Sequence, residues 1–198
     1  RARYRAYFEI NNAKSPVEKI RLDDSPRVIL VPGVGLFGVG SDAKSAHVAA
    51  DLAETTVDVT TNAEAVGRFK SISKYDQFEI EYWSLEQAKL SKGTEKPLAR
   101  QVAVVTGAGG TIGRAIAAAF KAQGADVALL DRDANAVSAA AAAVGGLAVT
   151  ADVTDPKSVD AAFRQVTEAF GGVDILVSNA GAAWQGSMDE VDDKVLRE

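Results

Sequence analysis

The chain has 198 residues, with 47% hydrophobic and 25% charged side chains and a formal net charge of −5, which is typical of a soluble globular protein of one large or two small domains. Its acidic balance argues against a nucleic-acid surface, and no apolar run approaches the ~18 residues that cross a bilayer. It has no cysteine, which excludes disulfides and thiolate metal sites and favours a cytoplasmic location.

The first 90 residues predict a small α/β arrangement. Residues 26–31 have the composition of a strand, and a turn separates them from a second strand at 36–40. A helix is expected from Asp42, because apolar residues recur there at helical spacing and form a core-facing stripe. The stripe consists of Ala46, Ala49, Ala50, Ala53 and Val57. Two shorter helices are expected at 63–69 and 81–90.

A change in composition near residue 92 predicts a domain boundary. Most of the aromatic residues come before it, whereas alanine and glycine are in excess after it. Residues 91–97 are polar and include both glycine and proline, which is typical of a linker. We therefore expect a first domain at 1–91, a linker at 92–100 and a second domain at 101–198.

The second half begins with an apolar strand that runs directly into a glycine-rich turn and a helix. Residues 101–113 read QVAVVTGAGGTIG, and a helical pattern continues to residue 123. Gly107, Gly110 and Gly113 have the spacing that a dinucleotide pyrophosphate requires, for a tight turn, close approach of backbone to phosphate, and close packing of helix on strand. The helix N-terminus would direct free N–H groups at the anion.

Three further strands are expected, each followed by polar residues and separated from the next by a helical pattern. They are 126–130 before Asp131, 147–151 before Asp152, and 173–178 before Asn179. Asp131 stands where a dinucleotide fold places the acid that accepts hydrogen bonds from the ribose hydroxyls. The alternation predicts an α/β fold with a Rossmann-type, doubly wound parallel sheet, its strands in the order 3-2-1-4. A helix at 134–144, stopped by Gly145-Gly146, is expected between the second and third strands of this half. Thr154 is expected to cap the helix that follows Asp152.

The motifs TGAGGTIG at 106–113, Asp131, Asp152-Val153 and Asn179-Ala180-Gly181 together resemble the opening half of a short-chain dehydrogenase/reductase. The resemblance covers about residues 101–198. It implies an NAD(P)-dependent oxidoreductase that acts on a small alcohol, an aldehyde or a sugar-derived substrate. Thr111 departs from the commonest family pattern, which has glycine at that position, whereas Gly110 fills an alternative spacing.

The resemblance also implies the residues that hold the cofactor. Gly107, Ile112 and Gly113 would line the pyrophosphate, Asp131 would bind the ribose, Asp152 and Val153 the adenine, and Asn179, Ala180 and Gly181 would brace the sheet beside the cofactor. Gly110, Thr111 and Arg132 complete the predicted site. A carboxylate at Asp131 favours NAD by repelling a 2′-phosphate, whereas Arg132 could receive that phosphate, so NADP stays an alternative.

The catalytic residues of that family would lie further along the chain. Its chemistry needs a Ser, and a Tyr four residues before a Lys that lowers the tyrosine pKa. Ser178 and Ser187 come too early, and no tyrosine has Lys four residues later. The tyrosines are Tyr4, Tyr7, Tyr75 and Tyr82. No catalytic residue is therefore assigned, and we expect a fragment that carries the cofactor half of a longer enzyme.

Residues 1–91 resemble the last part of a class II, metal-dependent aldolase domain, through the order strand, turn, strand and long helix. Val34 stands where that family has a zinc-binding His, so no metal site is predicted. Together with residues 82–86 (YWSLE), the two halves resemble bifunctional aldolase/dehydrogenases of the rhamnulose-1-phosphate aldolase/lactaldehyde dehydrogenase type. This implies carbohydrate metabolism, a small-molecule substrate and a homo-oligomer for the full-length protein, with no nucleic acid or membrane as partner.

Several alternatives stay open at this point. His47 is the only histidine, and we expect it on a helix surface, since a metal site would need carboxylates alone around it. Trp184 follows the Asn-Ala-Gly turn, where it would contact substrate or serve packing. A non-catalytic dinucleotide-binding or scaffold module is the competing function, and an active aldolase-like half is a third. A Ser and a Tyr-x-x-x-Lys beyond Glu198 would favour the dehydrogenase.

Overall fold

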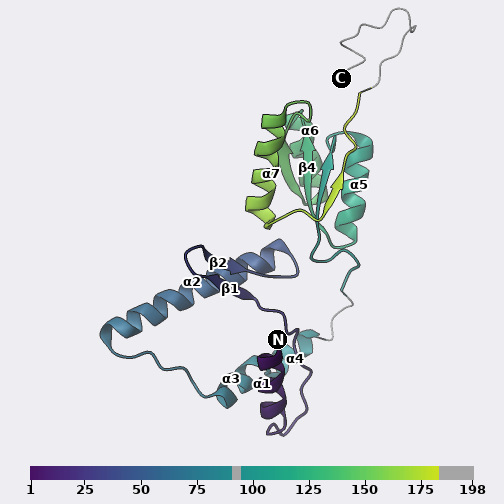
Figure 1. Ribbon diagram of the computed structural model, residues 1–198. Coiled ribbons are helices and arrows are strands. Elements are labelled where there is room, and N and C mark those ends of the chain that lie inside the picture. Colours follow the sequence, from purple (N-terminus) through teal and green to yellow (C-terminus); the bar gives the residue numbers. More distant parts are fainter. Residues whose placement is uncertain (91–94, 183–198) are drawn as a thin grey trace, which may run out of the picture. The chain divides into compact units, whose positions relative to one another are not determined.

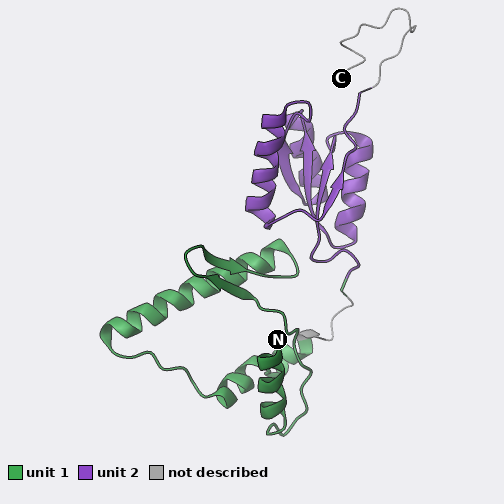
Figure 2. Cartoon of the chain, viewed as in Figure 1, with its two compact units in different colours: residues 1–95 green, residues 96–198 purple. Residues whose placement is uncertain are grey.

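The computed structural model describes residues 1–90 and 95–182 (Figure 1). The chain divides into two compact units, unit 1 at Arg1–Glu95 and unit 2 at Lys96–Glu198 (Figure 2). The predicted linker at 92–100 spans this division, and its residues 92–94 lie outside the described part of the chain. Ser187 and Trp184 lie outside it as well.

Unit 1 combines helices with a two-stranded antiparallel hairpin. Its elements within the described residues are α1 (Ala2–Asn12), β1 (Val28–Val31), β2 (Gly35–Gly38), α2 (Ala43–Val66), α3 (Lys74–Glu81) and α4 (Ser84–Leu90). The hairpin pairs Val31 with Gly35, and Gly33 takes a φ of 76° in the turn, a conformation that suits glycine. Helix α2 begins after Asp42, whose side chain accepts a hydrogen bond from the Ser45 N–H at 2.7 Å.

The helices of unit 1 differ from those that the sequence predicts. Helix α2 continues to Val66, so the separate helix expected at 63–69 is in part its last turn. The helix expected at 81–90 begins later, as α4 at Ser84, and α3 at Lys74–Glu81 was not predicted. The predicted core-facing stripe is not buried. Its four alanines are only partly covered and Val57 is 49% exposed, because the hairpin that packs on α2 has just two strands.

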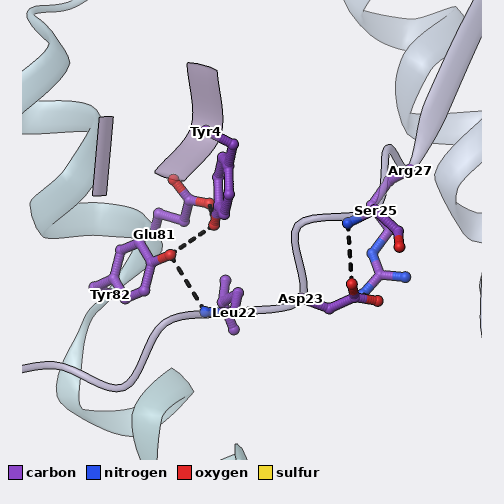
Figure 3. A network of polar contacts seen from close by, with 7 residues as sticks. All are labelled: Tyr4, Leu22, Asp23, Ser25, Arg27, Glu81 and Tyr82. Atoms are coloured by element: carbon purple, nitrogen blue, oxygen red, sulfur yellow. Dashed lines mark hydrogen bonds and ion pairs between the residues drawn. The ribbon is translucent and has the colours of Figure 1, made fainter. Parts of the chain in front are cut away.

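An aromatic cluster between α1 and α3 forms the buried centre of unit 1. The rings of Phe78 and Tyr82 are fully buried and stacked, with centroids 4.6 Å apart, and Phe8 lies 5.1 Å from the Tyr82 ring. The Tyr4 hydroxyl donates to the Glu81 carboxylate at 2.6 Å and lies 2.6 Å from the Tyr82 hydroxyl (Figure 3). Burial, and then the hydrogen bond to Glu81, raise the pKa of Tyr4 far above its usual value.

Unit 2 is a four-stranded parallel sheet with helices on both faces. Its elements within the described residues are β3 (Val102–Thr106), α5 (Thr111–Ala122), β4 (Asp126–Asp131), α6 (Ala134–Val144), β5 (Leu147–Thr150), α7 (Pro156–Phe170) and β6 (Ile175–Val177). The strands lie in the order β5-β4-β3-β6 and all neighbours are parallel. The α/β class and the order 3-2-1-4 predicted from the sequence are confirmed.

The core of unit 2 consists of two apolar layers, one on each face of the sheet. Helices α5 and α6 cover one face, where Val105 and Leu129 are fully buried, and α7 covers the other, where Val104 is fully buried (Figure 1). Because both faces of β3 and β4 are covered, these strands read as nearly continuous apolar runs. Their carboxyl ends are thereby fixed at one edge of the sheet.

The helix boundaries of unit 2 follow from local chemistry, with one correction. Helix α6 ends at Gly145 in the left-handed conformation, as the sequence predicts. Thr154 does not cap α7, since Asp155 does so by accepting the Lys157 N–H at 3.1 Å. Thr154 instead donates its N–H and hydroxyl to Asp152. None of the helices in the described residues has the length and apolar character that crossing a bilayer requires.

Candidate cofactor-binding site

The carboxyl ends of β3 and β6 are held together by a clamp of hydrogen bonds between Thr106 and Asn179. The Thr106 hydroxyl accepts the N–H groups of Asn179 and Ala180, each at 3.0 Å, and donates to the Val177 carbonyl at 3.3 Å. The Asn179 amide nitrogen donates to the carbonyls of Thr106 at 2.9 Å and of Gly107 at 3.4 Å. The clamp therefore fixes the glycine-rich turn over the sheet edge.

Glycine stands at three positions of this turn for different structural reasons. Gly107 has a φ of 63°, and a Cβ there would lie 2.9 Å from the Ala180 Cα. A Cβ on Gly113 would overlap the Gly107 carbonyl oxygen and lie 2.9 Å from the Asn179 amide nitrogen. A Cβ on Gly110 would meet only the Gly107 carbonyl oxygen, at 3.4 Å. The backbone at Gly110 is thus open to a ligand, whereas Gly107 and Gly113 serve close packing.

Helix α5 presents its N-terminus beside this open backbone. Its N-cap is Gly110, and no side chain caps the first turn. The N–H groups of a first helical turn have no partner within the helix, and the helix dipole makes this end attractive to an anion. Ile112, in the same turn, is 69% exposed. The backbone donors and the exposed apolar side chain fit a pyrophosphate with an apolar group beside it.

Asp131 lies at the end of β4, where its carboxylate contacts the glycine-rich turn. One carboxylate oxygen accepts the Gly109 N–H at 2.9 Å and the other accepts the Asp133 N–H at 3.1 Å. An ionised carboxylate has about four acceptor positions, so these two bonds leave it able to accept ribose hydroxyls. Asp131 and the open end of α5 are therefore brought to the same side of the turn by the contact with Gly109.

The neighbouring strand end adds a second carboxylate and an exposed apolar residue. β5 pairs with β4, and the N–H of Ala151 donates to the Asp131 carbonyl at 2.9 Å. Hydrogen bonds from Thr154 lower the pKa of Asp152, and the positive charge of Arg132 lowers it further. Val153 is 46% exposed. Asp152 is therefore held ionised, and Val153 offers an apolar surface of the kind that an adenine contacts.

The structure gathers most of the predicted residues at one edge of the sheet. An open glycine backbone, an uncapped helix end and an adjacent carboxylate fit a dinucleotide, and the roles of these residues toward a bound cofactor stay predictions. Gly181 is exposed, and a Cβ added there would have no atom within 4 Å. The sequence prediction omitted Thr106 and Gly109. A polar residue at the end of an otherwise apolar strand was the one available signal for Thr106.

Other residues weighed from the sequence lie in unit 1. His47 is exposed on α2, and Val34 is 71% exposed in the hairpin turn. Among the described residues, no group of three or more His, Cys, Asp or Glu could hold a metal ion. Unit 1 also has a groove of about 1200 Å³ formed by α1 and α3. None of its lining residues belongs to the predicted cofactor site.

Comparison with known families agrees with this division of the chain. Residues 101–198 match the family model for short chain dehydrogenase, and residues 1–90 match the model for aldolase class II, second domain. Each half of the chain is therefore similar to a different family, the second half to short-chain dehydrogenases and the first half to the second domain of class II aldolases.

Individual relatives cover one or both halves. The uncharacterized oxidoreductase YuxG of Bacillus subtilis is 34% identical over 195 residues, which span 94% of this chain and 28% of YuxG. Galactitol 2-dehydrogenase of Agrobacterium fabrum is 47% identical over 85 residues, 42% of this chain and 33% of that enzyme. The crystal structure of 3-ketoacyl-(acyl-carrier-protein) reductase from Brucella melitensis with NADH is 37% identical, with a TM-score of 0.48 and coverage of 49% of this chain and 41% of that one. The chain thus spans less than half of each.

We predict that Thr106→Val destabilises unit 2 by about 2 kcal/mol, because it leaves the N–H groups of Asn179 and Ala180 without their acceptor at a largely buried position. Thr167→Val is the matched control, since the Thr167 hydroxyl lies exposed on α7. Urea unfolding followed by circular dichroism measures both variants. A Thr106→Val protein as stable as the Thr167→Val control would contradict the clamp.

Proposed function

We propose that unit 2 binds a nicotinamide dinucleotide, with NAD(H) preferred over NADP(H), as the cofactor domain of a short-chain dehydrogenase. The observation that carries the proposal is the Asp131 carboxylate beside the glycine-rich turn, where it accepts the Gly109 N–H at 2.9 Å. A carboxylate at this position accepts hydrogen bonds from ribose hydroxyls and repels a 2′-phosphate. The match of residues 101–198 to the short chain dehydrogenase model supports the same proposal.

Each part of the site has its own task in this proposal. The first-turn N–H groups of α5 and the open backbone at Gly110 receive the pyrophosphate. Asp131 orients the adenosine ribose, and Asp152 with Val153 borders the adenine. When bound, the nicotinamide supplies the hydride chemistry. The residues of this chain bind and orient the cofactor, while the Thr106–Asn179 clamp keeps the sheet edge fixed beside the nicotinamide end of the cofactor.

The substrate class that we propose is a small polyol, alcohol or aldehyde derived from a sugar. Two relatives that match the second half are named for polyols, galactitol 2-dehydrogenase and D-threitol dehydrogenase of Mycolicibacterium smegmatis, at 47% and 42% identity. The class II aldolase domain in the same chain supports a link to sugar breakdown. A bifunctional enzyme in which an aldolase releases a short aldehyde such as lactaldehyde, and the dehydrogenase acts on it, would unite both halves.

A non-catalytic dinucleotide-binding module is the second candidate. It is favoured by the kind of contacts gathered at the unit 2 site, since an open backbone at Gly110 and a carboxylate at Asp131 bind and orient a cofactor and serve a non-catalytic module equally well. Hydride transfer between an alcohol and a carbonyl also needs a proton donor or acceptor at the oxygen. Both candidates predict cofactor binding, so catalytic turnover has to be measured to distinguish them.

We predict that Asp131→Ala weakens NADH binding by roughly 1–3 kcal/mol, the range for losing hydrogen bonds to a charged group, while NADPH binding weakens less. The measurement is calorimetric titration of both cofactors. Asp160→Ala is the matched control, because Asp160 lies exposed on α7 and pairs with Arg164 at 3.9 Å, away from the turn. Equal NADH affinities in the wild-type and Asp131→Ala proteins would exclude this role for Asp131.

We predict that the 198-residue chain binds cofactor without turning over short aldehydes or polyols at an enzyme-like rate. Positioned acid–base catalysis contributes typically ~10²–10⁴-fold, and no tyrosine is present in unit 2 to supply it. NADH absorbance with a panel of such substrates measures turnover. Rapid turnover by this chain would show that another residue supplies the proton. A polypeptide that continues with a Ser and a Tyr-x-x-x-Lys but stays inactive would favour the non-catalytic module.

A further inference from the structure

We propose that Gly109 is a positioning residue that sets the preference for NAD(H), by holding the Asp131 carboxylate in place and leaving it room. The proposal rests on the function proposed above and deepens it, because it assigns cofactor specificity to a second residue. Gly109 acts through Asp131 and makes no contact with the cofactor in this account. Its two contributions are a hydrogen-bond donor and an empty side-chain position.

The donor is the backbone N–H of Gly109. It lies 2.9 Å from one Asp131 carboxylate oxygen, while the Asp133 N–H lies 3.1 Å from the other oxygen. Two donors on different oxygens determine both the position of the carboxylate and the rotation of its plane. A short side chain at the end of a strand would otherwise be free to rotate toward solvent. The turn that receives the pyrophosphate is therefore also the support of the group that receives the ribose.

The space where a side chain of residue 109 would lie is equally restricted. A Cβ on Gly109 would lie 2.9 Å from the bonded Asp131 oxygen and 3.0 Å from the carboxyl carbon. It would also lie 2.9 Å from the Cβ of Ala136 on α6. Gly109 does not have a positive φ, so space, and not backbone conformation, requires glycine here. Any larger residue must displace the carboxylate or move α6.

Helix α6 is the harder of the two to move. It presents Val137, Ala140 and Ala141 to the core, where all three are buried, and its N-terminus is fixed by the Asp133 side chain, which accepts the N–H groups of Asn135 and Ala136. Among the described residues, the hydrogen bonds that hold the Asp131 side chain are those from the Gly109 and Asp133 N–H groups. An added methyl group at Gly109 therefore displaces the carboxylate first. The displaced carboxylate binds the ribose hydroxyls less well and repels a 2′-phosphate less strongly. Arg132, the next residue in the sequence, is then the charged group that receives such a phosphate.

The test is calorimetric titration of Gly109→Ala with NADH and with NADPH. We expect NADH affinity to fall about tenfold, the scale of one lost hydrogen bond to a charged group, and NADPH affinity to fall much less. The preference for NADH should therefore fall about tenfold. Gly172→Ala is the matched control, because Gly172 has no positive φ and no atom lies within 4 Å of its added Cβ. Both affinities of this control should match those of the wild-type protein.

A double-mutant cycle shows whether Gly109 acts through Asp131. In an Asp131→Ala background, Gly109→Ala should change NADH affinity less than about twofold, because the group that it displaces is gone. A tenfold fall in that background too would overturn the proposal and make Gly109 part of the turn alone. Equal losses for NADH and NADPH in the single variant would overturn it in the same way.

Two further outcomes are distinguishable. A wild-type protein that binds neither cofactor contradicts the proposed function itself, whereas a Gly109→Ala protein with wild-type preference contradicts only the role of Gly109. Circular dichroism reports whether Gly109→Ala folds. If it does not, Ala136→Gly is added to open the α6 side, and the double variant is titrated. It should still show reduced NADH preference, because its added Cβ still abuts Asp131, and wild-type preference would overturn the proposal.

Discussion

The hydrogen bonds between Thr106 and Asn179 are the constraint on which the candidate site depends. Strand pairing fixes the spacing of β3 and β6 up to Val105 and Val177, but it does not fix where the chain lies beyond the end of each strand. Here one hydroxyl and one amide join β3 to the segment after β6, over 73 residues of sequence. Gly107 and Gly113 can then approach Asn179 so closely that a Cβ on either would not fit. The clamp thus determines where the turn, and with it the first turn of α5, can lie.

The site is built from contacts between loops as much as from the strands that carry them. The carboxylate of Asp131 and the backbone of Gly109 support one another across 22 residues of sequence. Hydrogen bonds from Thr154, and then the charge of Arg132, lower the pKa of Asp152 at the adjacent strand end. The uncapped N-terminus of α5 and two carboxylates therefore lie along one edge, and this separation of charge suits a ligand with a pyrophosphate at one end and ribose hydroxyls at the other.

Unit 2 could be predicted well because its signals are local or follow from motif order. Helix α6 has the bounds 134–144 that the sequence predicts, since Gly145 ends it. Thr154 was wrong as a cap because Asp155, a stronger acceptor beside Pro156, takes that place. Unit 1 was harder to predict, because its contacts join residues far apart in the sequence. The Tyr4 hydroxyl and Glu81, for example, are 77 residues apart, and no sequence pattern indicates such a pair. Gly109 was missed for the same reason, since glycine in a turn does not reveal which side chain needs its space.

The central claim is that a nicotinamide dinucleotide binds at the carboxyl edge of the unit 2 sheet. Backbone amide chemical shifts of the ¹⁵N-labelled protein, recorded during titration with NAD⁺, test it residue by residue. The account predicts shifts concentrated at 107–113, 131–133, 152–153 and 179–181, with unit 1 unaffected. Saturable shifts confined to the groove between α1 and α3, or no shifts at all at millimolar NAD⁺, would contradict it.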